Sequence, residues 1–175
     1  AAIPAPSARS AFLFLMYTGE CYKPSNTGRL IADVAADSHA YVWARTNPDP
    51  ALLQLLQQPD YAPIVVFPHE YAAVERCISH VPAALQTGAK KPLFVMLDGT
   101  WREAKKMFSK SPYLDAFPVL GINPTVASGY ILREAAHLHQ LCTAEVGIEV
   151  LQLAGDQQAS EDLATYFQHF RRQYM

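Results

Sequence analysis

The chain has 175 residues, a formal net charge of −2 at pH 7, and a composition in which 50% of the residues are hydrophobic. This length suits one full-sized core, and the composition excludes a disordered chain. No apolar run approaches the roughly 20 residues of a membrane-spanning helix, and the small net charge gives no global sign of a nucleic-acid binder. We therefore expect one cytoplasmic domain over residues 1–175, without membrane contact.

In the first half of the chain, short apolar runs alternate with amphipathic stretches. This pattern is typical of an α/β fold with a mainly parallel sheet flanked by helices. The expected strands are 12–16, 40–43 and 64–67. One helix is expected from Asn26, and another from Asp49, which can cap a helix that has Pro50 in its first turn. A modest helix is expected around 71–77.

In the second half, the unbroken apolar run 93–97 is the clearest strand of the chain, as expected for a strand covered on both faces. The preceding segment, 81–92, is predicted to be a loop. After the strand, Thr100 followed by Glu103 forms a capping box, which predicts a helix beginning at Trp101. The remaining expected elements are strands over 118–122 and 130–132 and helices over 143–154 and from Ser160.

The turn after strand 93–97 is the first candidate site. Asp98 lies at the carboxyl end of a strand, where open α/β sheets bind ligands. Gly99 permits the close approach of a ligand, and the N–H groups at the helix start can bind an anionic group. We favour Asp98 as an acid/base group, with a plain turn residue as the alternative. The helix also carries basic side chains that either hold a polyanion or form a solvated face: Arg102, Lys105, Lys106 and Lys110.

Two further segments precede expected helices. Lys23-Pro24-Ser25-Asn26-Thr27-Gly28-Arg29 combines small hydrogen-bonding groups, a glycine and two cations. Such a set suits phosphate, carboxylate or base edges, and an ordinary capped helix start is the alternative. It lacks the spacing of a P-loop. Cys142-Thr143-Ala144-Glu145 is the second segment, with Glu145 at the third position of a cap.

Metal-ligating and nucleophilic motifs are incomplete. His137 and His139 have no third ligand nearby, and His69-Glu70 lacks the second histidine of the zincin helix. The 3 cysteines are widely spaced without a C-x-x-C pair, which argues against a disulfide framework or a cysteine zinc site. We expect no metal within this chain and passive cysteines.

Three separated blocks, taken in order, resemble the DTW-domain family. The family is named for an Asp, a Thr or Ser, and a Trp in the arrangement of Asp98-Gly99-Thr100-Trp101. Its N-T-G-R-L block is similar to residues 26–30, and its C-terminal blocks are similar to Leu132-Arg133-Glu134 and Cys142-Thr143-Ala144-Glu145-Val146. The resemblance runs nearly from end to end. Bacterial members resemble tRNA-uridine aminocarboxypropyltransferases and the SPOUT class of S-adenosylmethionine enzymes, which implies a C-terminal trefoil knot over about 93–154.

The resemblance implies a specific reaction, the transfer of the 3-amino-3-carboxypropyl group of S-adenosylmethionine to N3 of a uridine in tRNA. It implies that Asp98 assists loss of the N3 proton and that 5′-methylthioadenosine is released. The implied co-substrate pocket involves Phe67, Pro68, Leu97, Gly99, Thr100, Trp101, Leu132, Arg133, Cys142, Thr143 and Glu145, with core packing as the alternative for Trp101. The implied RNA contacts are Lys23, Ser25, Asn26, Thr27, Arg29, Arg102, Lys105 and Lys106.

Two other functions stay open from the sequence, a SPOUT-type RNA methyltransferase and a non-catalytic RNA-binding module. Bacterial members of the family usually carry a cysteine-rich N-terminal segment that looks like a zinc site. The residues from Ala1 onward lack it, so any zinc would belong to such a segment. The expected partners are tRNA and S-adenosylmethionine, and the oligomeric state is left open, a monomer included.

Overall fold

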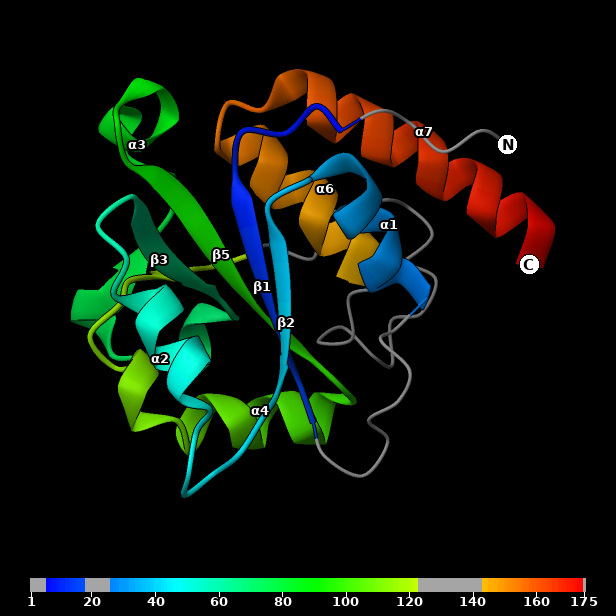
Figure 1. The fold of residues 1–175 in the computed structure, drawn as a ribbon. Coiled ribbons are helices and arrows are strands. Elements are labelled where there is room, and N and C mark those ends of the chain that lie inside the picture. The colour runs from blue at the N-terminus through cyan, green and yellow to red at the C-terminus, as the bar shows by residue number, and fades with distance from the viewer. Residues whose placement is uncertain (1–5, 18–25, 123–142, 175) are drawn as a thin grey trace.

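The computed structural model describes residues 6–17, 26–122 and 143–174, and these build an α/β fold around one parallel sheet (Figure 1). The sheet has six strands in the order β2-β1-β5-β3-β6-β4. The strands are β1 (Ala11–Met16), β2 (Ser38–Val42), β3 (Tyr61–Val66), β4 (Cys77–Ile78), β5 (Lys91–Asp98) and β6 (Val119–Leu120). All their pairings are parallel, which confirms the expected fold class.

Helices cover both faces of this sheet. The α-helices are α1 (Asn26–Val34), α2 (Pro50–Leu56), α3 (Ala83–Thr87), α4 (Trp101–Ser109), α6 (Thr143–Leu153) and α7 (Gln157–Tyr174). Three short 3₁₀ helices lie in the connections of the described chain: η1 (His69–Tyr71) and η2 (Val74–Arg76) between β3 and β4, and η3 (Pro112–Leu114) between α4 and β6. None of the helices in the described part of the chain is long and apolar enough to cross a membrane.

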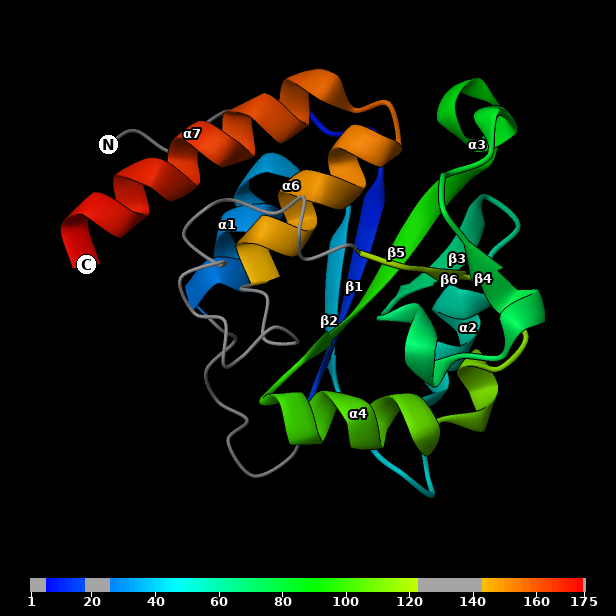
Figure 2. The same ribbon diagram turned by 180° about the vertical axis from the view of Figure 1, so that it is seen from behind.

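Alternation along the strands divides the interior into two cores. Phe94 and Met96 of β5 face the core that α1, α6 and α7 cover. Leu93 and Val95 face the core that α2 and α4 cover. Figures 1 and 2 show α1, α6 and α7 gathered against one face, while α4 crosses near the carboxyl ends of β1 and β5. We call these the α1/α6 face and the α4 face.

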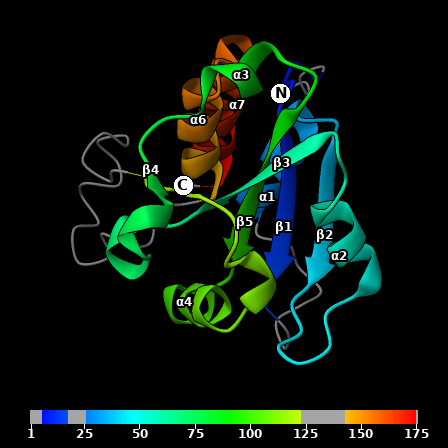
Figure 3. The ribbon, with the colours of Figure 1, turned by 90° about the vertical axis from the view of Figure 1, so that its left-hand side faces the viewer.

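The strand order creates a switch point between β1 and β5. These strands are neighbours, but the chain continues from β1 through α1 to β2 at one edge, and from β5 through α4 to β6 beyond β3. The two helices therefore cover opposite faces (Figure 3). Open α/β sheets bind ligands at the carboxyl ends of the strands at such a point. Asp98 ends β5 at this position.

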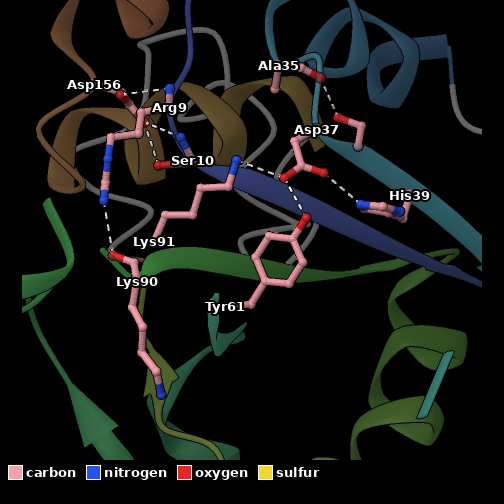
Figure 4. Close-up of polar contacts among 10 residues, drawn as sticks. Arg9, Ser10, Ala35, Asp37, His39, Tyr61, Lys90, Lys91 and Asp156 are labelled. Atoms are coloured by element: carbon pink, nitrogen blue, oxygen red, sulfur yellow. Dashed lines mark hydrogen bonds and ion pairs between the residues drawn. The ribbon is translucent and has the colours of Figure 1, made fainter. Parts of the chain in front are cut away.

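The opposite, amino edge of the sheet is fixed by a polar cluster on Asp37 (Figure 4). Its carboxylate accepts hydrogen bonds from the Tyr61 hydroxyl at 2.6 Å and from His39 Nε2 at 2.7 Å, and Lys91 Nζ lies 2.8 Å away. Partial burial opposes ionisation, but these three partners outweigh it and hold the pKa of Asp37 below its ordinary value. Burial raises the pKa of Tyr61 to about 12, and the hydrogen bond to the Asp37 carboxylate contributes to the same shift.

Several predicted elements differ from the structure because distant contacts decide them. The predicted helix over 71–77 is wrong: η1 and η2 are separate turns, and Arg76 donates to the carbonyls of Leu114 and Phe117 at 2.8 and 2.9 Å. The predicted loop over 81–92 contains α3. Arg9 donates to the Leu85 carbonyl in this helix and to the carbonyls of Gly88 and Lys90 after it, and Figure 4 shows the bond to Lys90. Tertiary partners override weak local patterns in both places.

The last helix also begins earlier than predicted. The Ser160 N–H donates to the Asp156 carbonyl at 2.9 Å, so helical bonding starts a turn before Ser160. The Ser160 hydroxyl donates to the Ile148 carbonyl at 2.9 Å and ties α7 to α6 instead of capping a helix. The other expected helices and strands are present with shifted ends. The predicted strand over 130–132 lies outside the described residues, and the predicted knot needs residues 123–142, which also lie outside them.

Candidate active site

Asp98 is held at the switch point by strand pairing. Its carbonyl accepts a hydrogen bond from the Tyr17 N–H at 3.3 Å, which keeps β1 and β5 together to their ends. Asp98 is 9% exposed, and it shares the strand parity of Phe94 and Met96. Strand alternation therefore directs its side chain to the α1/α6 face.

The same face carries the starts of α1 and α6. Gly147 lies one turn into α6, and a Cβ atom there would lie 2.6 Å from Ile31 Cδ1 of α1. This close approach needs glycine. Two of the blocks singled out in the sequence, at Asn26–Arg29 and at Thr143–Glu145, therefore begin adjacent helices.

The charges on this face are complementary to a ligand with both signs of charge. Asp98 and Glu145 are the charged side chains that are buried among the described residues, at 9% and 7% exposure. The first turns of α1 and α6 lie side by side on this face (Figures 1 and 2), and free N–H groups at helix starts attract anions. The carboxylates can receive a cationic group, and the helix starts an anionic one.

The turn itself is built by the predicted capping box, which is confirmed. The Glu103 N–H donates to Thr100 Oγ1 at 3.2 Å, and the Thr100 N–H donates to Glu103 Oε1 at 2.8 Å. A Cβ atom on Gly99 would lie 2.8 Å from Glu103 Oε1, so glycine leaves room for the cap. Both Gly99 and Thr100 therefore have a structural role, and their contacts with a co-substrate stay predictions.

Trp101 lies on the opposite side of the sheet from the Asp98 side chain. Its indole stacks on Phe67, with centroids 5.4 Å apart, and Phe67 stacks on Phe108 at 4.4 Å. Phe67, Leu97 and Trp101 all pack in the core of the α4 face. The structure thus brings the backbones of these predicted pocket residues to the same edge as Asp98, but it does not bring their side chains to its face. The partly buried Pro68 follows Phe67.

The predicted basic surface of α4 is present, and it is paired with tyrosines. Arg102, Lys105 and Lys106 are exposed. Lys105 Nζ lies 5.3 Å from the ring centroid of Tyr71, and Lys106 Nζ donates to the Tyr17 hydroxyl at 3.2 Å. Arg29, at the other face, is exposed as well.

Tyr17 is a site residue that sequence reasoning missed. It follows β1 directly, its N–H pairs with Asp98, and its ring stacks on Trp43 with centroids 5.6 Å apart. The one signal in the sequence was that Tyr17 directly follows a predicted buried strand, as Asp98 does. Without the strand order, nothing showed that these two strand ends are neighbours.

The remaining predicted site residues lie outside the described residues: Lys23, Ser25, Leu132, Arg133, Cys142 and the side chains of Asn26 and Thr27. Thr143 is partly buried at the start of α6. Within the described part of the chain, no three His, Cys, Asp or Glu side chains gather into a group that could hold a metal ion.

The sequence model of the DTW domain matches residues 1–175. The chain belongs to the DTW domain family. This family is associated with tRNA modification, which indicates a tRNA-modifying enzyme. No solved structure matches the chain. The residues that give the DTW domain its name stand here as Asp98, Thr100 and Trp101: one at the switch point, one at the helix cap and one in the core of the α4 face.

Proposed function

We propose that this DTW-domain protein transfers the 3-amino-3-carboxypropyl group of S-adenosylmethionine to N3 of a uridine in tRNA. The observation that carries the proposal is the position of the signature aspartate. Asp98 is buried at the carboxyl end of a central strand, at the switch point of the sheet, in a chain that matches the family over its full length. We also propose that the protein acts in the cytoplasm.

The residues on the α1/α6 face fit S-adenosylmethionine as co-substrate. Its aminocarboxypropyl group ends in an ammonium and a carboxylate, and its sulfur is positively charged. Asp98 and Glu145 provide buried carboxyl groups on this face. The first turns of α1 and α6 provide N–H donors for the carboxylate. We assign Glu145 and Thr143 to binding of this group.

In the reaction we propose, Asp98 acts as general base. Its carboxylate accepts the proton from uridine N3. The N3 lone pair then bonds to the carbon that joins the aminocarboxypropyl group to sulfur. The carbon–sulfur electrons go to the sulfonium, which leaves as the neutral thioether 5′-methylthioadenosine, and Asp98 passes its proton to water. The helix starts hold this carbon, rather than the methyl group, against N3, and this positioning selects the product.

The tRNA backbone is proposed to lie along the exposed cations of α4, Arg102, Lys105 and Lys106, and near Arg29. The chain as a whole carries a net charge of −2, so attraction of RNA depends on such a local group. We further propose that the chain over about 93–154 forms the trefoil knot of the SPOUT class. A crystal structure with bound co-substrate tests the knot directly.

The decisive experiment uses two labelled forms of S-adenosylmethionine with unmodified tRNA. We expect label placed in the carboxyl group to enter the RNA and label placed in the methyl group to leave in methylthioadenosine. Entry of the methyl label alone would make the protein an RNA methyltransferase. RNA binding without entry of either label would make it a binding module.

A further inference from the structure

Four groups on the α4 face form a column that runs along α4. Trp101 and Phe108 are seven residues apart on α4, which separates them by about 10 Å along the helix axis. Phe67 lies between them, nearly parallel to both, at interplanar angles of 11° and 8°. The Arg76 guanidinium lies over the Phe108 ring, 5.6 Å from its centroid. The column thus begins at a cation and ends at Trp101.

The column is buried in its middle and partly exposed at both ends, Arg76 and Trp101. Phe67 and Phe108 are buried, and Arg76 is fixed there by two backbone carbonyls. Trp101 is partly exposed. Phe67 covers one face of the Trp101 indole, and Trp101 is the partly exposed aromatic ring at this end of the column.

Tyr71 and Lys105 border the Trp101 end of the column. The Tyr71 ring meets Trp101 edge to face, with centroids 5.3 Å apart at 64°, and is partly exposed. Lys105 is exposed and lies over the Tyr71 ring. A cation beside partly exposed aromatic rings is the arrangement with which proteins bind single-stranded nucleic acid, by stacking bases and neutralising phosphates.

We propose that Trp101, Tyr71 and Lys105 form a stacking site for an unpaired RNA base that flanks the modified uridine. This inference rests on the proposed function, and it adds a second contact to the RNA. The site holds a flanking base because Trp101 and the Asp98 side chain lie on opposite faces of the sheet, so one uracil does not satisfy both. The exposed cations of α4 favour RNA over an apolar protein segment.

Trp101 can be observed on its own because the chain has only 2 tryptophans. The other, Trp43, is 4% exposed and donates to the Ser111 hydroxyl at 2.8 Å. We would label the protein with 5-fluorotryptophan and titrate it with an oligouridylate of about ten nucleotides, within the usual site sizes. The fluorine resonance of Trp101, assigned with Trp101→Phe, is expected to shift on binding, and that of Trp43 to stay.

Substitutions then separate stacking from charge. Trp101→Leu is expected to weaken oligouridylate binding roughly tenfold, and Trp101→Phe less, since it keeps an aromatic face. Lys105→Met is expected to weaken binding, whereas the matched control Lys90→Met, an exposed lysine at the amino edge, is not. Circular dichroism shows whether each variant is folded. The fluorine titration of the unsubstituted protein tests the proposal even if a variant fails to fold.

Each outcome decides between the two proposals. Saturating oligouridylate with an unmoved Trp101 resonance would overturn the stacking site and leave the transfer reaction standing. A shifted Trp101 resonance without transfer of the carboxyl label to tRNA would support the stacking site and overturn the transferase. Absence of oligouridylate binding would overturn the stacking site alone, and absence of carboxyl-label transfer to tRNA would overturn the transferase alone.

Discussion

The two faces of the sheet meet at the carboxyl ends of β1 and β5, and they present opposite surroundings there. On the α1/α6 face, buried carboxylates lie beside two helices in close contact. On the α4 face, partly exposed rings lie beside exposed lysines. The first suits chemistry on a small co-substrate, and the second suits a large polyanion. The DTW signature therefore contributes Asp98 to the α1/α6 face and Trp101 to the α4 face.

The geometry of a strand-to-helix turn explains this division. Asp98 is still in β5, so its direction follows strand alternation, and Trp101 is already in α4, which covers the other face. Gly99 and Thr100 make the turn between them. A proton acceptor gains from a site that excludes water, whereas phosphate contacts form at exposed cations. Substitutions on one face should therefore separate catalysis from RNA binding.

The largest expected effect is that of Asp98→Asn. The amide keeps the size of the carboxylate and cannot accept the N3 proton, so single-turnover transfer to tRNA should fall by roughly a hundredfold to ten-thousandfold. Binding of 5′-methylthioadenosine, measured by calorimetry, should persist. The exposed Asp115→Asn is the control for loss of one negative charge. An unchanged transfer rate would remove Asp98 from the role of base.

On the other face, Lys105→Met combined with Lys106→Met should weaken tRNA binding by roughly tenfold. The logarithmic salt dependence of the affinity should also become less steep, by about 0.7–0.9 for each phosphate that the protein no longer neutralises. The transfer rate at saturating tRNA should change far less than in Asp98→Asn. Lys90→Met is the matched control. If the salt slope is unchanged, the two lysines belong to a solvated helix face.

Elements with strong local signals could be predicted from the sequence. In α2, Asp49 accepts a hydrogen bond from the Ala51 N–H at 2.9 Å, and Pro50 opens the helix, as its residue types indicate. The capping box of α4 could likewise be predicted from Thr100 and Glu103. The helix α3 and the strand β4 escaped prediction because their partners are distant in sequence: Arg9 for α3, and β6 for β4.

The candidate site divides in the same way. Strand 93–97 and the cap at Thr100 located Asp98 without any knowledge of the fold. Its nearness to Tyr17 and the separation of Trp101 onto the other face depend on strand order and on the faces that the helices cover. Neither the nearness of Asp98 to Tyr17 nor the position of Trp101 on the other face can be predicted from a single segment of the sequence. Periodicity identified the side chains, and only the topology assigned them to surfaces.

The packing of α1 against α6 offers a smaller test of the α1/α6 face. In Gly147→Ala the new methyl group would lie 2.6 Å from Ile31 Cδ1 and 3.2 Å from Leu163 Cδ2. We expect a net loss of about 1–2 kcal/mol of unfolding free energy in urea titrations, since overpacking outweighs the helix propensity gained. Ile31→Val should recover part of this loss when combined with Gly147→Ala. Independent, additive losses would show that the two residues are not in contact.

The smallest expected effect lies at the amino edge, away from both functional faces. Asp37→Asn should cost about 1 kcal/mol at neutral pH, because the Asp37 side chain is partly exposed and its three partners are polar. The folded-state pKa of Asp37 lies below the ordinary 3.8, so its contribution is complete above that value and is lost as pH falls through the folded pKa. The difference in urea stability between the two proteins should therefore be constant near neutrality and shrink in acid. In Asp37→Asn, the transfer rate per folded molecule and the salt dependence of tRNA binding should both match those of the unsubstituted protein, because neither face at the carboxyl edge is altered. A change in either quantity would show that the amino edge of the sheet influences the carboxyl edge.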